Sequence, residues 1–391
     1  MFADQNTFAS KVKYHKAFGT SKYAAGTELD PHSRRKHCGF MMRATSMFIV
    51  LLVVLASATA AGATIPDFWK LGYRPVDPAL PGSPLERTID QSKRYLVRVT
   101  GYFHVRRNPA EERVRIYLPL PADDVYQRVY VSRLRPAPAE ILHSRHGYQI
   151  AAFDFGVLPR GAEIVVRYDA EVAVGKIQWT VDPSQVGPLT DIPAAIREDY
   201  LVDGEFYRVN DPAVRAAAHK AVGDERHPLR MMARILSHVR KSLTYVLDGR
   251  KVDAATTLKL GHGSCTEHTF LMIGMARSLG LPARFMAGSV RKVSPFTRHH
   301  YDRVYHKIVE VYLPRIGWVP VETTAARHRA MFAPEKLVGA SNHQMLFFVH
   351  EPEPGLAPLD PRRNIITHRP FGVESQLSLG RQVTVHWERL W

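Results

Sequence analysis

The pattern of apolar and polar positions divides the chain after residue 93 into two kinds of segment. Up to about residue 174, apolar and polar residues alternate in short runs separated by turn signals, which indicates strands. The expected strands cover 95–105, 113–118, 127–134, 148–155 and 162–174. Several short strands at fairly regular spacing are typical of a β-sandwich, so we expect an all-β sandwich domain over 94–175.

After Pro183 the apolar period becomes helical. The expected helices cover 191–201, 211–222, 227–245 and 253–260. The strands expected after them cover 283–290, 307–313 and 318–322, with closing strands at 342–350 and 382–391. Helices followed by strands predict an α+β domain, which we place at 180–345, followed by a C-terminal β segment at 346–391.

A further helix begins at Cys265, directly after a turn that contains Gly261 and Gly263. The apolar residues after Cys265 keep a helical period until Gly280 and Pro282 end it. A thiol in the first turn of a helix lies where unpaired backbone N–H groups and the helix dipole stabilise an anion. Such a position lowers the pKa of a cysteine, so Cys265 is the candidate nucleophile.

The N-terminal region has the pattern of a secretory signal peptide. Arg43 precedes an uncharged apolar run at 47–55, and small residues follow up to Ala63. We therefore expect a signal peptide at 41–63, a disordered extension or an upstream misassigned start at 1–40, and a proline-rich linker at 64–93. The apolar run is shorter than the ~20 residues of a membrane span, so the expected location is periplasmic or secreted rather than anchored in the inner membrane.

Removal of 1–63 changes both the charge and the cysteine content. This segment holds eight Lys and Arg and three acidic residues, so the formal charge falls from +16 to +11. A basic exported protein can make peripheral contact with anionic envelope surfaces, whereas its scattered basic residues and lack of a recognition motif argue against nucleic acid. Cys38 is removed as well, which leaves Cys265 as a lone thiol that is either reactive or a small buried hydrophobe.

The segment 306–322 predicts a hairpin, which is either an ordinary surface hairpin with a solvated histidine and glutamate or the source of a partner for the thiol. His306 heads its first strand and Glu322 ends its second, so the two residues meet across the hairpin if the turn is centred on Pro314. A turn centred nearer Ile316 offsets them and requires a bulge. A carboxylate in that position can fix the tautomer of the imidazole. Glu310 follows His306 by four residues on the same strand face and is a competitor for this role.

Two stretches carry a family resemblance: GHGSCTEHTFLMIGMARSLGLPARFMAGSV at 261–290 and HKIVEVYLPRIGWVPVE at 306–322. They resemble the core of the transglutaminase-like superfamily, which is similar to papain in active-site logic, and the resemblance covers about residues 195–330. It implies a papain-like α+β core, with Cys265 as nucleophile, His306 as base and acid, and Glu322 as the orienting acid. The strands at 94–174 resemble the β-rich domain that precedes this core in some bacterial members.

The chain departs from the family pattern at three points. Glu322 stands where the family usually has Asp, and Ile308 stands where an aromatic residue often lies. No candidate calcium cluster is found, and neither a cofactor nor a metal is expected. A zinc site formed by His262, Cys265, His268 and His306 is a weaker alternative, since no CxxC or HExxH pattern accompanies it.

Other polar residues near these motifs have weaker assignments. Tyr245 is either a packed helix-end residue or a contributor to an oxyanion site, for which the backbone N–H of Cys265 is the better donor. Glu267 and His268 cap the cysteine helix, lie on the surface or shape the pocket, and the sequence leaves these alternatives open. A further histidine pair, His299 and His300, is expected in a solvated loop.

Together these features predict an exported cysteine-dependent amide hydrolase or acyltransferase. The reaction is expected to use a Cys265–His306–Glu322 triad and an acyl-enzyme, on a peptide or protein substrate such as a cell-wall peptide. The alternative is a non-catalytic binding or scaffolding module at the cell envelope that keeps the fold.

Overall fold

The computed structural model of the chain describes residues 63–64, 89–143, 148–247, 249–250, 252–291, 298–302, 305–323, 337–351 and 375–390. The extension expected at 1–40, and nearly all of the expected signal peptide and linker, lie outside the described residues. In the described part of the chain, no helix combines the length and apolar character needed to cross a membrane.

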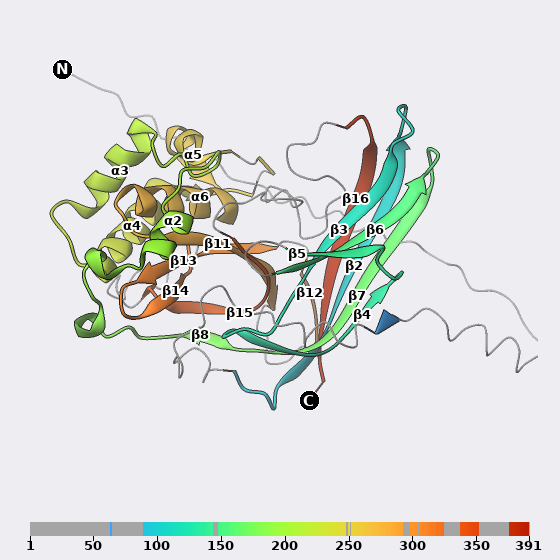
Figure 1. Ribbon diagram of the computed structural model, residues 1–391, viewed down its shortest axis with the longest axis horizontal. Coiled ribbons are helices and arrows are strands. Elements are labelled where there is room, and N and C mark those ends of the chain that lie inside the picture. The colour runs from blue at the N-terminus through green and yellow to red at the C-terminus, as the bar shows by residue number, and fades with distance from the viewer. Residues whose placement is uncertain are drawn as a thin grey trace, which may run out of the picture. The chain divides into compact units, whose positions relative to one another are not determined.

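The N-terminal half of the described chain is rich in strands, which form two sheets (Figure 1). These strands are β1 (Ala63–Thr64), β2 (Arg94–Arg107), β3 (Arg113–Leu120), β4 (Gln127–Arg135), β5 (Glu140–His143), β6 (Gln149–Val157) and β7 (Glu163–Val174). One sheet has the order β1-β4-β7-β2-β16-β12 and the other the order β3-β6-β5. Their inward-facing residues form one hydrophobic core. All five strands expected over 94–174 are confirmed, whereas β5 was not expected.

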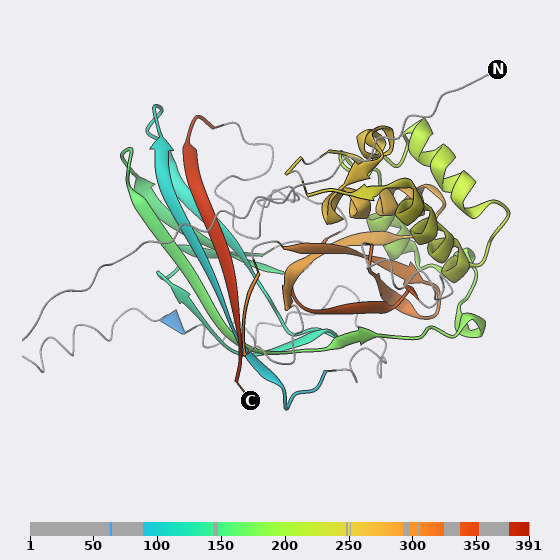
Figure 2. The same ribbon diagram turned by 180° about the vertical axis from the view of Figure 1, so that it is seen from behind.

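The larger sheet is completed by strands from much later in the chain, as Figure 2 shows for β16. β16 (Ser378–Arg389) pairs antiparallel with the whole length of β2, and β12 (His299–Asp302) pairs with β16. Trp387 and Val385 on β16 are completely buried in the core of the β-rich region. The apolar residues that alternate along β16 face the core of the β-rich region, so this C-terminal strand belongs to the N-terminal sheet. The domain limits expected from the sequence stay a prediction.

The second region combines helices with a five-stranded sheet, so the fold is α+β. Its helices are α2 (Ala194–Tyr200), α3 (Pro212–Val222), α4 (Pro228–Ser242), α5 (Ala254–Leu260) and α6 (Cys265–Ser278), with short 3-10 turns η3 (Pro183–Gln185) and η4 (Leu189–Asp191). The sheet has the order β14-β13-β11-β15-β8. Its strands are β8 (Lys176–Gln178), β11 (Ala283–Arg291), β13 (His306–Leu313), β14 (Gly317–Val321) and β15 (Ala340–Glu351).

Helix α6 is the centre of this region. Every residue from Cys265 to Arg277 is buried, because α6 packs against α3, α4 and α5 and also against the sheet through β11 and β13 (Figure 1). The backbone approach is close at Gly274, where an added Cβ would lie 2.1 Å from the carbonyl oxygen of Tyr207. Glycine at this position lets the two segments touch, and it holds the first turn of α6 at a defined depth in the core.

The expected helix at 227–245 is wrong at its C-terminal end. Helix α4 ends at Ser242, and Leu243 already has extended backbone angles of φ −114° and ψ 135°. The next two residues form strand β9 (Thr244–Tyr245), which pairs in parallel with β10 (His262–Gly263). Pairing with a segment that lies just before α6 has therefore overridden the helical period.

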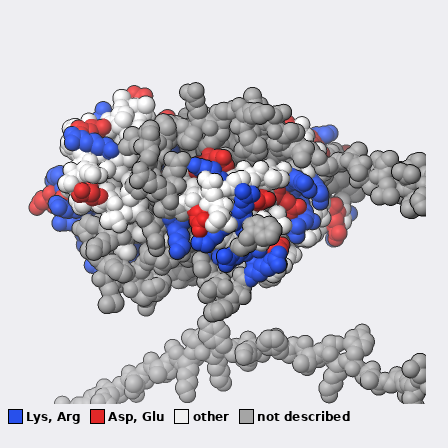
Figure 3. Space-filling view, turned by 90° about the horizontal axis from the view of Figure 1, so that it is seen from below, with Lys and Arg blue, Asp and Glu red and all other residues white. Residues whose placement is uncertain are grey.

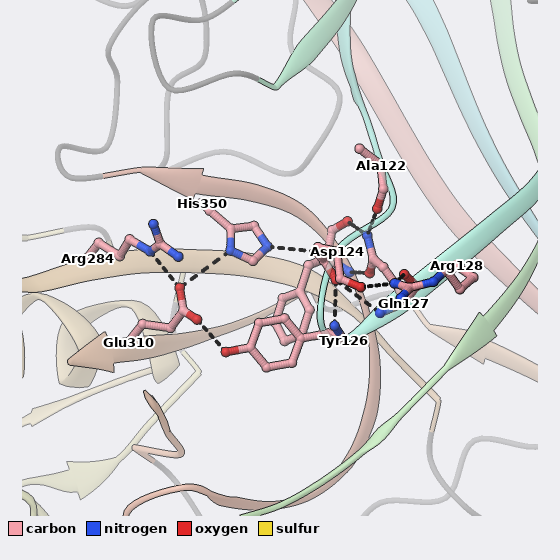
Figure 4. A network of polar contacts seen from close by, with 9 residues as sticks. Ala122, Asp124, Tyr126, Gln127, Arg128, Arg284, Glu310 and His350 are labelled. Atoms are coloured by element: carbon pink, nitrogen blue, oxygen red, sulfur yellow. Dashed lines mark hydrogen bonds and ion pairs between the residues drawn. The ribbon is translucent and has the colours of Figure 1, made fainter. Parts of the chain in front are cut away.

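The β-rich region and the α+β region are joined by buried polar contacts. The Gln127 side chain donates to the Phe347 carbonyl oxygen at 2.9 Å and accepts from the Phe347 N–H at 2.7 Å. Beside this contact, the Tyr126 hydroxyl donates to the Glu310 carboxylate (Figure 4). Both contacts run from the start of β4 to the five-stranded sheet, so the two sets of sheets are held by paired polar groups as well as by apolar packing.

Glu310 lies at the centre of a buried charge network (Figure 4). Its carboxylate accepts from Arg284 Nε at 2.6 Å and lies 3.5 Å from His350 Nδ1, while His350 Nε2 lies 3.4 Å from Asp124. Burial raises the pKa of Glu310, but Arg284, His350 and Tyr126 outweigh burial and lower it to about 2. The network is therefore charged at neutral pH.

We expect Glu310→Gln to lower the free energy of unfolding by about 3–5 kcal/mol, because it leaves the Arg284 guanidinium buried without its carboxylate. The measurement is urea unfolding at pH 7. The control is Asp191→Asn, which breaks the exposed ion pair with Arg315 and should cost about 1 kcal/mol or less. Equal effects of the two substitutions would contradict the prediction.

The ion pair between Glu310 and Arg284 also makes the stability of the fold depend on pH. The folded-state pKa of Glu310 is depressed, so its stabilisation is complete above the unfolded-state pKa of about 4.3 and is lost as the pH falls toward 2. The difference in unfolding free energy between wild type and Glu310→Gln should therefore shrink in acid between these two values.

Candidate active site

Cys265 is the first residue of α6, and its surroundings are set by a capping box. The Ser264 hydroxyl caps the helix, and Glu267 Oε2 accepts from the Ser264 N–H at 2.7 Å and from the Ser264 hydroxyl at 2.6 Å. At Gly263 an added Cβ would lie 2.4 Å from the Cβ of Glu267, so only glycine leaves room for this cap. Glu267 is thus a capping residue. The sequence S-x-x-E was the signal that could have identified it.

His306 begins β13, and Glu322 follows the last residue of β14. The pairing runs from Val309 opposite Val321 to Leu313 opposite Gly317. This register is centred on Arg315, so continuing it places Glu322 opposite Ile308. Residues two apart on one strand share a face, so Glu322 is the diagonal neighbour of His306. The two are neither directly opposite nor brought together by a bulge, which corrects both alternatives expected from the hairpin.

The glutamate side chain is long enough to reach diagonally across the hairpin from Glu322 to the His306 ring. His306 Nε2 lies 2.9 Å from Glu322 Oε1 and 2.8 Å from Oε2, and Ser341 Oγ donates to Oε2 at 3.3 Å. Glu322 is only 2% exposed, so its charge acts on His306 with little screening by water. Glu322 thus holds the imidazole, although the resembling family usually has the shorter Asp here.

The remaining nitrogen of the His306 ring, Nδ1, is the one available to the thiol. The side chains of His306 and Cys265 form a hydrogen bond. Burial lowers the pKa of His306, but the Glu322 carboxylate and the Cys265 thiol raise it to about 10. Burial likewise raises the pKa of Cys265, yet His306 and Lys307 lower it to about 7. Between these values the pair is a thiolate and an imidazolium.

Lys307 is a contributor that the sequence analysis did not find. Its backbone N–H donates to the Cys265 sulfur, and its charge also lowers the pKa of the thiol. The Lys307 ammonium donates to the Tyr305 carbonyl oxygen at 3.3 Å, and the Cys265 sulfur lies 3.9 Å from that same oxygen. Strand alternation places the Lys307 side chain on the face opposite to His306, so no spacing rule pointed to it.

Tyr245 lies beside the nucleophile, on β9 rather than on a helix. Its phenol oxygen accepts a hydrogen bond from the backbone N–H of Cys265. Burial and the nearby Cys265 charge raise the pKa of Tyr245 to about 12, so the hydroxyl keeps its proton at neutral pH. The reading of Tyr245 as a packed helix-end residue is therefore wrong. A hydroxyl and a backbone N–H meet next to the thiol.

Part of the chain matches a known protein family. Residues 215–323 match the family model of the Transglutaminase-like superfamily, and that range contains Tyr245, Cys265, His306 and Glu322. The chain carries a transglutaminase-like domain. No curated protein matches the sequence.

Among solved structures, a candidate cysteine protease from Cytophaga hutchinsonii is similar with a TM-score of 0.54 at 14% identity, over 76% of this chain and 91% of that chain. This likeness shows a shared fold. The periplasmic domain of TgpA from Pseudomonas aeruginosa has a TM-score of 0.31 at 16% identity, over 65% and 94% of the two chains. A transglutaminase from red sea bream has a TM-score of 0.28 at 13% identity, over 58% and 46%. Scores this low carry no argument about this chain.

Several other candidates lie away from the thiol of the transglutaminase-like domain. Glu310 binds Arg284, Tyr126 and His350 and so does not compete with Glu322 for His306. His299 and His300 lie in β12, not in a loop, because this segment pairs with β16.

The histidines of the zinc alternative have other partners. His268 Nδ1 bonds to the Ser264 carbonyl oxygen at 2.8 Å, and His262 Nε2 lies 2.6 Å from Arg250. Among the described residues, no group of three or more His, Cys, Asp and Glu side chains is arranged to bind a metal ion.

The pH dependence of iodoacetamide alkylation tests the ion pair directly. We expect the Cys265 alkylation rate to titrate with a pKa of about 7, below the value of about 8.5 of a free thiol. His306→Ala should move this titration above 8.5, because burial then acts on the thiol without its main counter-charge. Lys307→Met should move it upward by a smaller amount. Ser278→Ala, at the far end of α6, is the matched control. A titration indifferent to His306 would contradict the assignment.

Proposed function

We propose that this protein is a cysteine-dependent amide hydrolase or acyltransferase in which Cys265, His306 and Glu322 form the catalytic triad. The observation that supports this most strongly is the continuous hydrogen-bonded chain from the thiol through the imidazole to a buried carboxylate. Nucleophilic catalysis by cysteine needs a thiolate, a proton-transfer partner and a group that orients that partner. The family match supports a catalytic function at the level of the superfamily.

In the proposed reaction the thiolate of Cys265 attacks the amide carbonyl carbon, and the carbonyl electron pair moves to the oxygen. The substrate carbonyl oxygen replaces the Tyr245 oxygen at the Cys265 N–H, and this N–H and the Tyr245 hydroxyl then donate to the oxyanion. The His306 imidazolium then gives its proton to the leaving nitrogen as the C–N bond breaks, which leaves a thioester. Water or a second amine, deprotonated by neutral His306, attacks the thioester and releases Cys265.

The substrate we propose is a peptide or protein outside the cytoplasm, such as a cell-wall peptide. This rests on the signal-peptide pattern at 41–63 and on the formal charge of +11 that remains without residues 1–63. Lys and Arg are interspersed with Asp and Glu on the described surface seen in Figure 3, whereas nucleic-acid binding favours a continuous basic patch. We favour hydrolysis over cross-linking, since water is always available there.

Trapping of the acyl-enzyme tests the function. The protein is incubated with a pool of peptides and with cell-wall stem peptides, and intact-mass analysis follows the adduct on Cys265. We expect a thioester adduct that hydroxylamine removes, and none with Cys265→Ala. An adduct that water clears supports hydrolysis, and transfer to an added amine supports the acyltransferase. If no adduct forms and the thiol titrates like a free cysteine, the non-catalytic envelope module is the better assignment.

Glu322 provides a second test. Glu322→Gln should lower kcat/KM by about 10²–10⁴-fold, because the imidazolium loses its charge partner and its fixed tautomer. The upper pH limit of activity should also fall, since Glu322 raises the pKa of His306 to about 10. Ser341→Ala, which removes only the second contact to Glu322, should cost less than about tenfold. Steady-state kinetics from pH 5 to 10 with the trapped substrate separates these effects, and a pH limit unchanged in Glu322→Gln would contradict the role.

A further inference from the structure

Strand β9 has an open edge beside the nucleophile. In the described part of the chain, β9 and β10 form a sheet of two strands, so β9 has a partner on one side. The Thr244 N–H donates to the Gly261 carbonyl oxygen and the Val246 N–H donates to the Gly263 carbonyl oxygen, each at 2.9 Å. Successive residues of a strand direct their N–H and C=O groups to opposite edges. The main-chain N–H and C=O of Tyr245 therefore point away from β10.

This edge is exposed and leads to the reacting thiol. Tyr245 is 49% exposed, and its side chain reaches the backbone N–H of Cys265. Leu247, two residues further along, is 54% exposed, the highest value among the large aliphatic side chains of the described residues. A strand edge with free main-chain groups is a template for pairing with another chain, and an exposed leucine beside it offers an apolar contact.

We propose that β9 is the docking strand for the substrate, and that the substrate is a polypeptide bound in extended form. One substrate residue pairs its main-chain N–H and C=O with the C=O and N–H of Tyr245 and so adds a third strand to the β10–β9 sheet. Leu247 contacts an apolar substrate side chain next to this residue. This inference rests on the proposed function and narrows its substrate class to an extended main chain.

The position of Tyr245 sets the register of the bound peptide. The hydroxyl of Tyr245 lies at the Cys265 N–H, where the scissile carbonyl must sit, while its main chain pairs with the peptide. The paired residue is therefore about one or two positions from the scissile carbonyl, given the ~3.3 Å rise of an extended chain. The docking strand as proposed binds the acyl side of the substrate. If the acyl donor were instead the side-chain amide of a glutamine, main-chain pairing with β9 would not be needed. An experiment can therefore distinguish a main-chain amide donor from a glutamine side-chain donor.

The experiment uses peptidyl chloromethyl ketones, which alkylate a thiolate without turnover. A parent tripeptide reagent with leucine on the acyl side is compared with versions that are N-methylated at each amide in turn, and with one that carries aspartate in place of leucine. Labelling of Cys265 is followed by intact mass, and each rate is divided by the iodoacetamide rate of the same protein. N-methylation removes one donor at a time, so this series needs no protein variant.

We expect one N-methyl position to lower the relative rate by about tenfold or more, the loss expected for one hydrogen bond, while the other positions change it by less than about threefold. Leu247→Asp should remove the preference for leucine over aspartate. Leu260→Asp, at the exposed leucine that ends α5, is the matched control and should keep the preference. Circular dichroism verifies the fold of both variants.

The outcomes separate this inference from the proposed function. The docking-strand proposal is overturned if no N-methyl position lowers the relative labelling rate, or if Leu247→Asp and Leu260→Asp have equal effects. A low pKa of the Cys265 thiol would still support the proposed triad in that case. If instead Cys265 reacts with iodoacetamide like a free thiol and none of the peptidyl reagents labels it, the proposed function fails and the docking strand fails with it.

Discussion

The contact between His306 and Glu322 is the interaction on which the rest of the site depends. Burial by itself lowers the pKa of His306 and raises that of Cys265, so both groups would be neutral at pH 7. The Glu322 carboxylate reverses the first effect, and the resulting imidazolium reverses the second. One buried acid thus determines the charge of two side chains. Its own burial makes this effective, since little water screens it.

The β-rich region contributes to the rigidity around this contact. Strand β13 carries His306 at one end and Glu310 further along, and Glu310 is held by Arg284 and by Tyr126 from the β-rich region. β15 is held to the same region by the paired hydrogen bonds between Gln127 and Phe347. These contacts restrain the five-stranded sheet at its interface with the β-rich region. Support of this kind from outside the candidate site is what precise placement of an imidazole requires.

The segment just before α6 shows how one local pairing can serve two purposes. The parallel contact of β9 with β10 brings the Tyr245 hydroxyl to the first N–H of α6. Among the residues that the structure describes, the same contact leaves the other edge of β9 open. The group we assign to oxyanion stabilisation and the edge we assign to peptide docking therefore come from one residue, through its side chain and its main chain respectively.

The sequence by itself determined most of the helices and strands and nominated the candidate reacting groups. The helical period after Cys265 and the alternating strands are local patterns, so the sequence predicted them directly. The S-x-x-E pattern that begins at Ser264 is equally local, although it was not used to assign the cap. The hairpin also carried enough information to nominate His306 and Glu322. Their diagonal placement could not be read, because it depends on a two-residue shift in register that the turn geometry decides.

Long-range pairing decided what remained. Glu310 lies on the same strand as His306 and could have paired with it. Instead its carboxylate binds Arg284 and Tyr126, and Tyr126 is 184 residues away in the chain. Tyr245 does not continue helix α4, because its strand partner Gly263 lies eighteen residues later in the chain. Strand β16 completed a sheet begun almost three hundred residues earlier at β2. A local pattern predicts which face of a helix or strand is apolar. Only the tertiary structure decides which distant group packs against that face.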